Sequence, residues 1–108
     1  MTEKETWHAR GAVRWFTTAE GGRSTGPPPG PRYSPTLTFP GDRADIPPTE
    51  IPAEHWSATL EFVDDPSNEP AEARVRFLAP DLMHDVVVSG GLAYIMEGPR
   101  AVGYIVFD

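Results

Sequence analysis

The chain has 108 residues, of which 39% are hydrophobic, and its net charge is −7 at neutral pH. This length suits one domain with a modest core, and the hydrophobic content argues against general disorder. There is no cysteine, which excludes a disulfide framework, a thiolate metal site and a cysteine nucleophile.

Residues 1–8 are predicted to be a flexible N-terminus, and residues 9–108 a single domain. The chain starts with charged residues and no apolar segment follows them, so we expect no secretory signal. No apolar run is long enough to cross a bilayer, so no membrane partner is expected. These features predict a cytoplasmic protein.

The pattern of apolar residues predicts strands rather than helices. Thirteen prolines disfavour long helices, because each proline fixes φ and removes a backbone donor. Apolar and polar residues alternate most clearly over residues 56–62 and 71–79, which places one set of side chains in a core and the other in water. In chain order, the predicted strands cover residues 8–17, 34–39, 56–62, 71–79, a short stretch at 85–88, 92–97 and 101–107.

The segments between these strands contain turn residues. Gly98-Pro99-Arg100 predicts a tight hairpin, and residues 64–69 predict an ordinary hairpin turn. Residues 20–32 are rich in glycine and residues 41–53 are rich in proline and acids, so both are expected to be surface loops. About six short strands with such turns indicate either a small barrel or a sandwich.

The negative charge is concentrated in one part of the chain. Residues 42–72 contain nine acids and one base, a net charge of −8, so the rest of the chain carries +1. A nucleic-acid binder normally shows a basic footprint, so the overall acidity disfavours RNA as a partner. The acidic segment would either bind a basic protein or keep the domain soluble.

Several short motifs follow one another in an order that is typical of a known family. They are Glu20-Gly21-Gly22-Arg23, Tyr33-Ser34-Pro35, the alternating strand that ends in Pro80, and Glu97-Gly98-Pro99-Arg100. Together they resemble the C-terminal β-barrel domain of elongation factor Tu over roughly residues 9–107. The resemblance implies an all-β fold, a small antiparallel β-barrel of about six strands.

The resemblance also implies what the domain does. In the family it packs against a GTPase domain and helps to hold the T-stem of aminoacyl-tRNA. This chain lacks the Gly-x-x-x-x-Gly-Lys-Ser/Thr loop that cradles phosphates, so neither GTPase activity nor a nucleotide is expected. Ser24, Thr36 and Met96 depart from the family's pattern and remove polar or basic groups from the side that faces tRNA.

We therefore expect a non-enzymatic binding or interaction module with a protein partner. A translation-related protein that binds RNA, in particular a tRNA stem, is one alternative, and a small-ligand-binding or enzymatic barrel is another. Arg23 would meet an anion or, in the simpler interpretation, pair with a nearby acid while the glycines form a turn. The predicted binding residues are Glu20, Arg23, Tyr33, Glu97, Gly98 and Arg100.

Other candidate sites are less specific. Five arginines would form a basic patch if their strands were neighbours, or else a solvated face with a few ion pairs. Trp15 and Phe16 are adjacent, so one of them is expected to point outward from its strand, where it would be available to a partner. The arginines in question are Arg14, Arg32, Arg74, Arg76 and Arg100.

No metal ligand, cofactor or catalytic residue is expected. The three histidines, His8, His55 and His84, lack the spacing of a metal site and are expected at the surface. The acidic run at residues 64–69 lacks the pattern of a calcium loop. Neither the order nor the spacing of the residues suggests a Ser–His–Asp arrangement.

Overall fold

The computed structural model describes residues 9–23, 26, 31–41, 45–78, 87 and 90–108. The predicted flexible N-terminus lies outside these residues, and so does the predicted strand at 85–88 apart from Val87, which is not in a strand. The elements are β1 (Ala9–Trp15), the 3-10 helix η1 (Thr18–Glu20), β2 (Arg32–Tyr33), β3 (Thr36–Thr38), β4 (Trp56–Phe62), β5 (Ala71–Phe77), β6 (Leu92–Glu97) and β7 (Arg100–Phe107).

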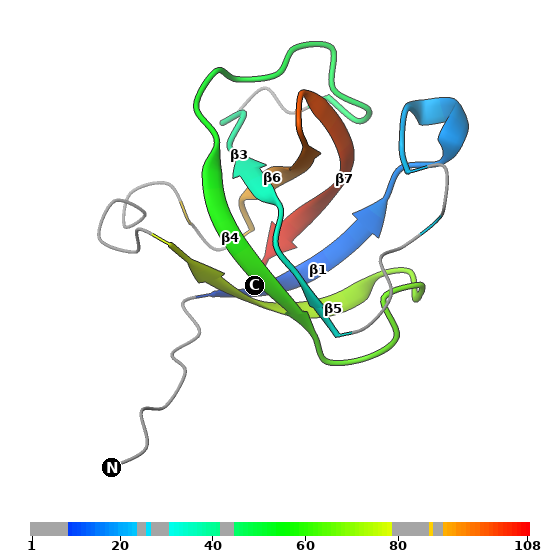
Figure 1. Ribbon diagram of the computed structural model, residues 1–108, viewed down its shortest axis with the longest axis vertical. Helices are drawn as coiled ribbons and strands as arrows, with labels where there is room; N and C mark the ends of the chain where they lie inside the picture. The colour runs from blue at the N-terminus through cyan, green and yellow to red at the C-terminus, as the bar shows by residue number, and fades with distance from the viewer. Residues whose placement is uncertain (1–8, 24–25, 27–30, 42–44, 79–86, 88–89) are drawn as a thin grey trace.

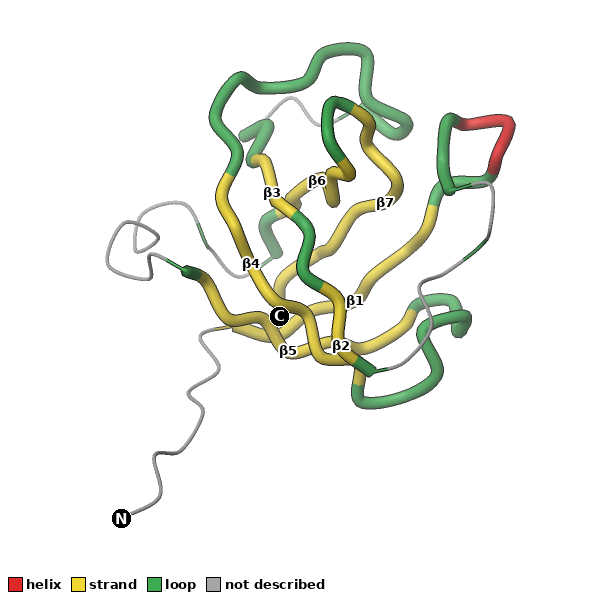
Figure 2. The backbone as a smooth tube through the Cα atoms, in the orientation of Figure 1, coloured by secondary structure: helices red, strands yellow, loops and turns green. Residues whose placement is uncertain are grey.

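The strands form one antiparallel sheet that closes on itself. Its order is β2-β4-β3-β6-β7-β1-β5, and a further pairing between β4 and β5 joins the two sides. The result is a six-stranded barrel (Figure 1), and β2 lies beside β4 as an extra strand (Figure 2). Closure pairs backbone groups that an open sheet would leave at its edges. The predicted small antiparallel β-barrel is therefore confirmed, and the barrel is favoured over the sandwich.

The strand predicted at residues 34–39 is found as the shorter β3, and β2 lies before it along the same neighbouring strand. Tyr33 lies opposite Leu60 and Thr36 lies opposite Ser57, so β2 and β3 follow one continuous register along β4. Pro35 interrupts them because it has no N–H to donate, although its carbonyl accepts from Ala58 N at 3.1 Å. The prediction of a strand at residues 34–39 missed β2, since a two-residue strand between prolines shows no alternation.

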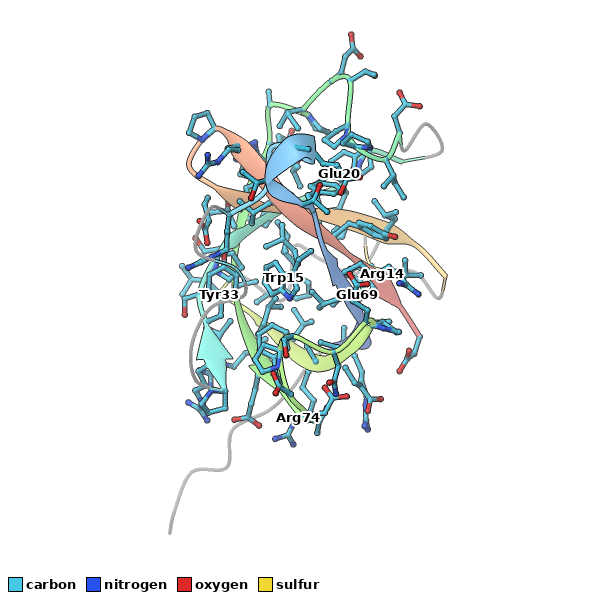
Figure 3. All side chains as sticks on the ribbon, turned by 90° about the vertical axis from the view of Figure 1, so that its right-hand side faces the viewer. Arg14, Trp15, Glu20, Tyr33, Glu69 and Arg74 are labelled. Atoms are coloured by element: carbon cyan, nitrogen blue, oxygen red, sulfur yellow. The ribbon has the colours of Figure 1, made fainter. Side chains whose placement is uncertain are left out.

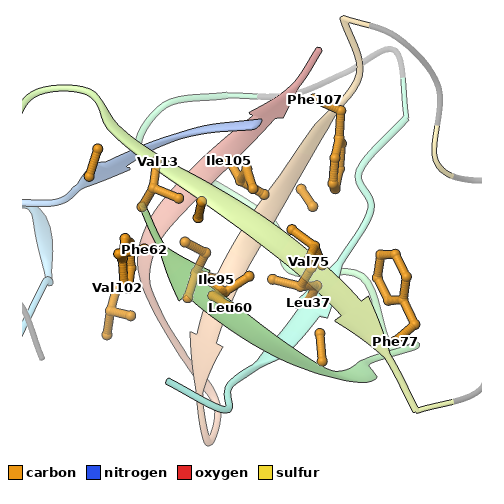
Figure 4. Close-up of a cluster of buried hydrophobic side chains, with 14 residues drawn as sticks. Val13, Leu37, Leu60, Phe62, Val75, Phe77, Ile95, Val102, Ile105 and Phe107 are labelled. Carbon is orange, nitrogen blue, oxygen red and sulfur yellow. The ribbon is translucent and has the colours of Figure 1, made fainter. Parts of the chain in front are cut away.

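Side chains fill the barrel interior (Figure 4). The inward positions of every strand of the barrel are apolar, as the alternation predicts. Gly103 on β7 lets β1 approach closely, because a Cβ there would lie 2.6 Å from the carbonyl oxygen of Arg14. The fully buried members of this core include Val13, Leu37, Leu60, Ala71, Ala73, Val75, Ala93, Ile95, Val102 and Ile105.

A second, smaller cluster lies on the outer face of β6 and β7. It consists of Phe16, Tyr94, Met96 and Ala101, with Ile51 of the proline-rich loop packed against it. Figure 2 shows this loop passing over the end of the barrel where β3, β6 and β7 lie. The segment predicted as a surface loop therefore also covers apolar side chains.

Hydrogen bonds hold this covering loop in place. The Tyr94 hydroxyl donates to the carbonyl of Asp45 at 2.7 Å, and the Thr38 hydroxyl donates to the carbonyl of Glu54 at 2.7 Å. Tyr94 and Thr38 lie on adjacent strands, opposite each other in the β3–β6 ladder. The loop is thus bonded to the barrel near both of its ends.

One of the two adjacent rings does point outward from its strand, as expected, but it is covered and therefore not available to a partner. Phe16 is only 5% exposed, in the second cluster, whereas Trp15 packs against the main core beside Phe62. The Trp15 indole N–H also donates to the carbonyl of Pro66 at 2.8 Å. Alternation holds here, and Phe16 is buried because a second apolar cluster covers the outer face where β1 ends.

Candidate binding site

Three of the predicted binding residues meet at one end of β6. Arg23 Nη1 and the Tyr33 hydroxyl both donate to Oε2 of Glu97. The Arg23 guanidinium also lies 5.8 Å from the centre of the Tyr33 ring, and its Nε donates to the carbonyl of Gly26 at 2.8 Å. This Arg23–Tyr33–Glu97 cluster joins the loop after η1, strand β2 and the end of β6.

The cluster is partly shielded from water. The side chains of Arg23 and Glu97 are 20% and 30% exposed. Burial, followed by the hydrogen bond to Glu97, raises the pKa of the Tyr33 hydroxyl well above its usual value. Tyr33 is therefore a neutral donor at physiological pH, and Glu97 accepts one charged and one neutral hydrogen bond, which strengthens the contact.

Glu20 does not join this cluster. Its carboxylate accepts from the backbone N–H of Thr17 at 2.9 Å, while its own N–H donates to the Thr17 hydroxyl at 3.3 Å. This reciprocal pair is a capping box that starts η1. Gly21 follows with φ at +94°, which favours glycine. Figure 3 shows Glu20 well separated from Tyr33.

The remaining predicted residues lie in the β6–β7 hairpin. Gly98 has φ at +60° in the turn, and Arg100 lies opposite Glu97 in the ladder with its side chain exposed. The predicted hairpin is confirmed. Arg23 pairs with an acid, as the simpler interpretation has it, and the structure brings Arg23 and Tyr33 together with Glu97 and the adjacent Gly98.

A wide groove begins at this cluster. It has a volume of about 1000 Å³ and opens to solvent along the outer face of β2, β3, β4 and β5. Tyr33 and Glu97 line it at one side, and Leu78, which is 82% exposed, lines it as well. The other lining residues are Ser34, Pro35, Thr36, His55, Ser57, Ala58, Thr59, Arg76, Phe77, Met96, Gly98 and Pro99.

Sequence reasoning missed this groove. Alternation correctly places Ser57 and Thr59 on the outward side of β4, but it does not show which strand lies beside them. The register adds Ser34 and Thr36 from the interrupted β2–β3 strand, and the Ser34 and Thr59 hydroxyl oxygens lie 3.4 Å apart. The hydroxyl-rich part of the groove thus arises from a long-range pairing.

The five arginines do not form a single patch. Arg32 Nε contacts Glu61 Oε2 at 3.1 Å, and Arg74 also pairs with Glu61. Arg32, Arg74 and Arg76 share the outer face of β2, β4 and β5, whereas Arg14 lies on β1, away from Arg74 in Figure 3. Of the two alternatives, the arginines are therefore closer to a solvated face with a few ion pairs than to an uninterrupted basic patch.

The described residues contain no group of three or more histidines or acids that could hold a metal ion. His55 is exposed, with a ring nitrogen 3.0 Å from the carbonyl of Pro52, and His8 and His84 lie outside the described residues. Asp65 accepts hydrogen bonds from the backbone N–H and the hydroxyl of Ser67, and these bonds lower the pKa of Asp65. They lie in the turn between β4 and β5, so the predicted hairpin turn is confirmed.

In the part of the chain that the structure describes, no helix has the length and hydropathy needed to traverse a bilayer. No protein-family model, curated protein or solved structure matches the chain. The likeness to the elongation factor Tu barrel therefore stays a prediction, and the chain is described by its fold as a closed, all-β antiparallel barrel with one extra strand.

Proposed function

We propose that this protein is a non-enzymatic binding module for a cytoplasmic protein partner, and that the groove beside the Arg23–Tyr33–Glu97 cluster is its contact surface. The observation that carries the proposal is the groove itself, an open hollow of about 1000 Å³ on the outside of a filled barrel. Its lining includes Tyr33, Met96 and Arg76, which are of residue types enriched at protein interfaces.

The state of Glu97 supports binding over catalysis. One carboxylate oxygen accepts from both Arg23 and Tyr33. Both contacts are made within the protein, so this oxygen is already engaged and is not positioned to act on a bound substrate. Glu97 is better suited to fixing the shape of the groove, because it connects the β6–β7 hairpin to β2 and to the loop that carries Arg23.

The proposal also extends the resemblance to the elongation factor Tu barrel. A stand-alone barrel of that kind would keep the scaffold without a GTPase domain. The net charge of −7 favours a protein over RNA as the occupant of its surface. In this proposal, Thr36 and Met96, two of the departures from the family's pattern, contribute to a protein-binding groove.

The test is selection of binders from a display library of random peptides, compared between two variants. Leu78→Asp places a charge in the groove, whereas Val63→Asp does so at an exposed apolar residue outside it. We expect enriched peptides to bind the first variant at least about tenfold more weakly, a loss of about 1.4 kcal/mol, and the second as tightly as the natural chain.

Circular dichroism spectra would establish that both variants are folded. The proposal is wrong if no peptide is enriched or if the two variants lose affinity equally. Enrichment of no peptide, together with binding of an RNA stem-loop that weakens steeply as salt is raised, would support the translation-related alternative.

A further inference from the structure

The strand register divides the outer face of the groove into rows that run across the strands. In the first row Thr36 lies opposite Ser57, and Leu78 N donates to the Ser57 carbonyl. In the second row Thr59 lies opposite Arg76. We call these the Leu78 row and the Arg76 row, and Ser34 completes the second through its contact with Thr59.

A third row continues beyond the groove. Glu61 lies opposite Arg32 on one side and Arg74 on the other, and both arginines pair with it. We call this the Glu61 row. Ser57, Thr59 and Glu61 are alternate residues of β4, so successive rows are about 6.6 Å apart along the strand.

The charge on this side of the barrel is opposite to that of the whole chain. The strands of this face, β2, β3, β4 and β5, carry Arg32, Arg74 and Arg76 against Glu61 and Glu72, a net formal charge of +1, whereas the whole chain carries −7. Among the described residues that line the groove, Arg76 is the cationic side chain and Glu97 the anionic one, and Glu97 is paired with Arg23. An occupant with carboxylates near the Arg76 row is therefore favoured.

A protein segment fits this face better than a nucleic acid does. Single-stranded nucleic acids stack their bases on exposed aromatic rings, but Phe77 is 3% exposed and the Tyr33 ring is held between Arg23 and Trp15. The favourable charge is also local, because the acidic segment 42–72 would repel a longer polyanion. A short acidic peptide would confine its charge to the groove.

We infer that the groove binds an extended peptide segment in which an apolar side chain is followed, at alternate positions, by two carboxylates. Alternate side chains of an extended peptide are about 6.6 Å apart, the same spacing as the rows. The apolar side chain would lie on Leu78, and the first carboxylate would accept from Arg76 and the Thr59 hydroxyl. The second would lie by the arginines of the Glu61 row. This inference rests on the proposed function.

The test uses fluorescein-labelled peptides of about eight residues that share one leucine and differ at the two alternate positions. Both alternate positions carry Asp in one peptide, Asn in the second and Lys in the third, and binding is measured by fluorescence anisotropy at low salt. We expect the Asp peptide to bind at least about tenfold more tightly than the Asn peptide, and the Lys peptide more weakly still. Arg76→Gln should weaken binding of the Asp peptide about tenfold and leave the Asn peptide unchanged.

Two further variants complete the design. Arg14→Gln removes an exposed arginine of β1 outside the groove and should leave all affinities unchanged. Thr59→Val removes only a hydroxyl, keeps the shape of the side chain, and should weaken the Asp peptide several-fold even if Arg76→Gln fails to fold.

The outcomes separate this inference from the proposed function. If the Asn or Lys peptide binds as tightly as the Asp peptide, and Leu78→Asp abolishes that binding, the acidic preference is wrong while the peptide-binding function stands. If none of these peptides and no display peptide binds, both are wrong. Binding of a labelled single-stranded RNA that depends on Arg76 would overturn the inference in favour of a nucleic acid.

Discussion

Two outer faces of the same barrel differ in what covers them. On the β6–β7 face, Tyr94 and Met96 are each 1% exposed, because the proline-rich loop packs Ile51 against their cluster. On the β4–β5 face, the outward positions are hydroxyl-bearing or charged, and the groove along them is open to solvent. The chain supplies its own cover for the first face and leaves the second accessible.

The two faces differ because the pattern of buried residues along their strands differs. Four consecutive residues of β6, from Ala93 to Met96, are buried, whereas buried and less buried residues alternate along β5. A strand that is apolar on both sides has to be covered on both sides, while an alternating strand can leave one face in water. Two-sided apolar strands thus indicate where a loop will fold back, and alternating strands indicate where a surface stays available.

The largest effect should come from opening the covered face. Tyr94→Ala would remove a buried aromatic ring together with the hydrogen bond to Asp45, and we expect it to lower the free energy of unfolding by about 3–5 kcal/mol. Ser57→Ala on the open face should change it by less than about 0.5 kcal/mol. Denaturant titration measures both, and similar losses in the two variants would contradict the division into covered and open faces.

A smaller effect should distinguish two ion pairs at the margins of these faces. Glu97→Gln keeps the shape of the side chain but removes the charge that Arg23 and Tyr33 contact, so we expect a loss of about 1.5 kcal/mol in the free energy of unfolding. Glu72→Gln is the matched control, since the Arg10–Glu72 pair is about half exposed and should contribute nothing measurable.

High salt should reduce the difference between these two variants only slightly, because the Glu97 pair is more shielded from water. A Glu97→Gln variant as stable as Glu72→Gln would mean that the Arg23–Tyr33–Glu97 cluster does not fix the hairpin to β2.

Local patterns were sufficient for most of the strands and turns, but neither for β2 nor for the site. Alternation located β4 with its observed bounds, and the turn residues Gly98-Pro99-Arg100 located the hairpin that contains β6. The β4–β5 closure and the meeting of Arg23 with Glu97, which lie 74 residues apart, depend on long-range register that no local pattern contains. Glu20 lies apart from this cluster because the capping box with Thr17 offers its carboxylate closer partners.

The smallest expected effect is a change of stability with pH, which is absent near neutral pH. It concerns Tyr33, at the edge of the open face. Burial raises the pKa of both Tyr33 and Tyr94, but only Tyr33 also donates to a carboxylate. In the unfolded chain a tyrosine loses its proton near pH 10, whereas folded Tyr33 keeps its proton to higher pH. Above about pH 10 the unfolded state therefore binds fewer protons, and the stability that Tyr33 contributes is lost as pH rises.

Ring-carbon NMR on labelled tyrosines resolves the two sites. Glu97→Gln should move the titration of Tyr33 to lower pH, because the neutral amide no longer opposes the tyrosinate charge, and should leave Tyr94 unchanged. If both tyrosines moved together, the hairpin and the covering loop would be coupled. The open groove and the covered face would then be coupled, and a partner bound in the groove would change the environment of Tyr94 under the loop.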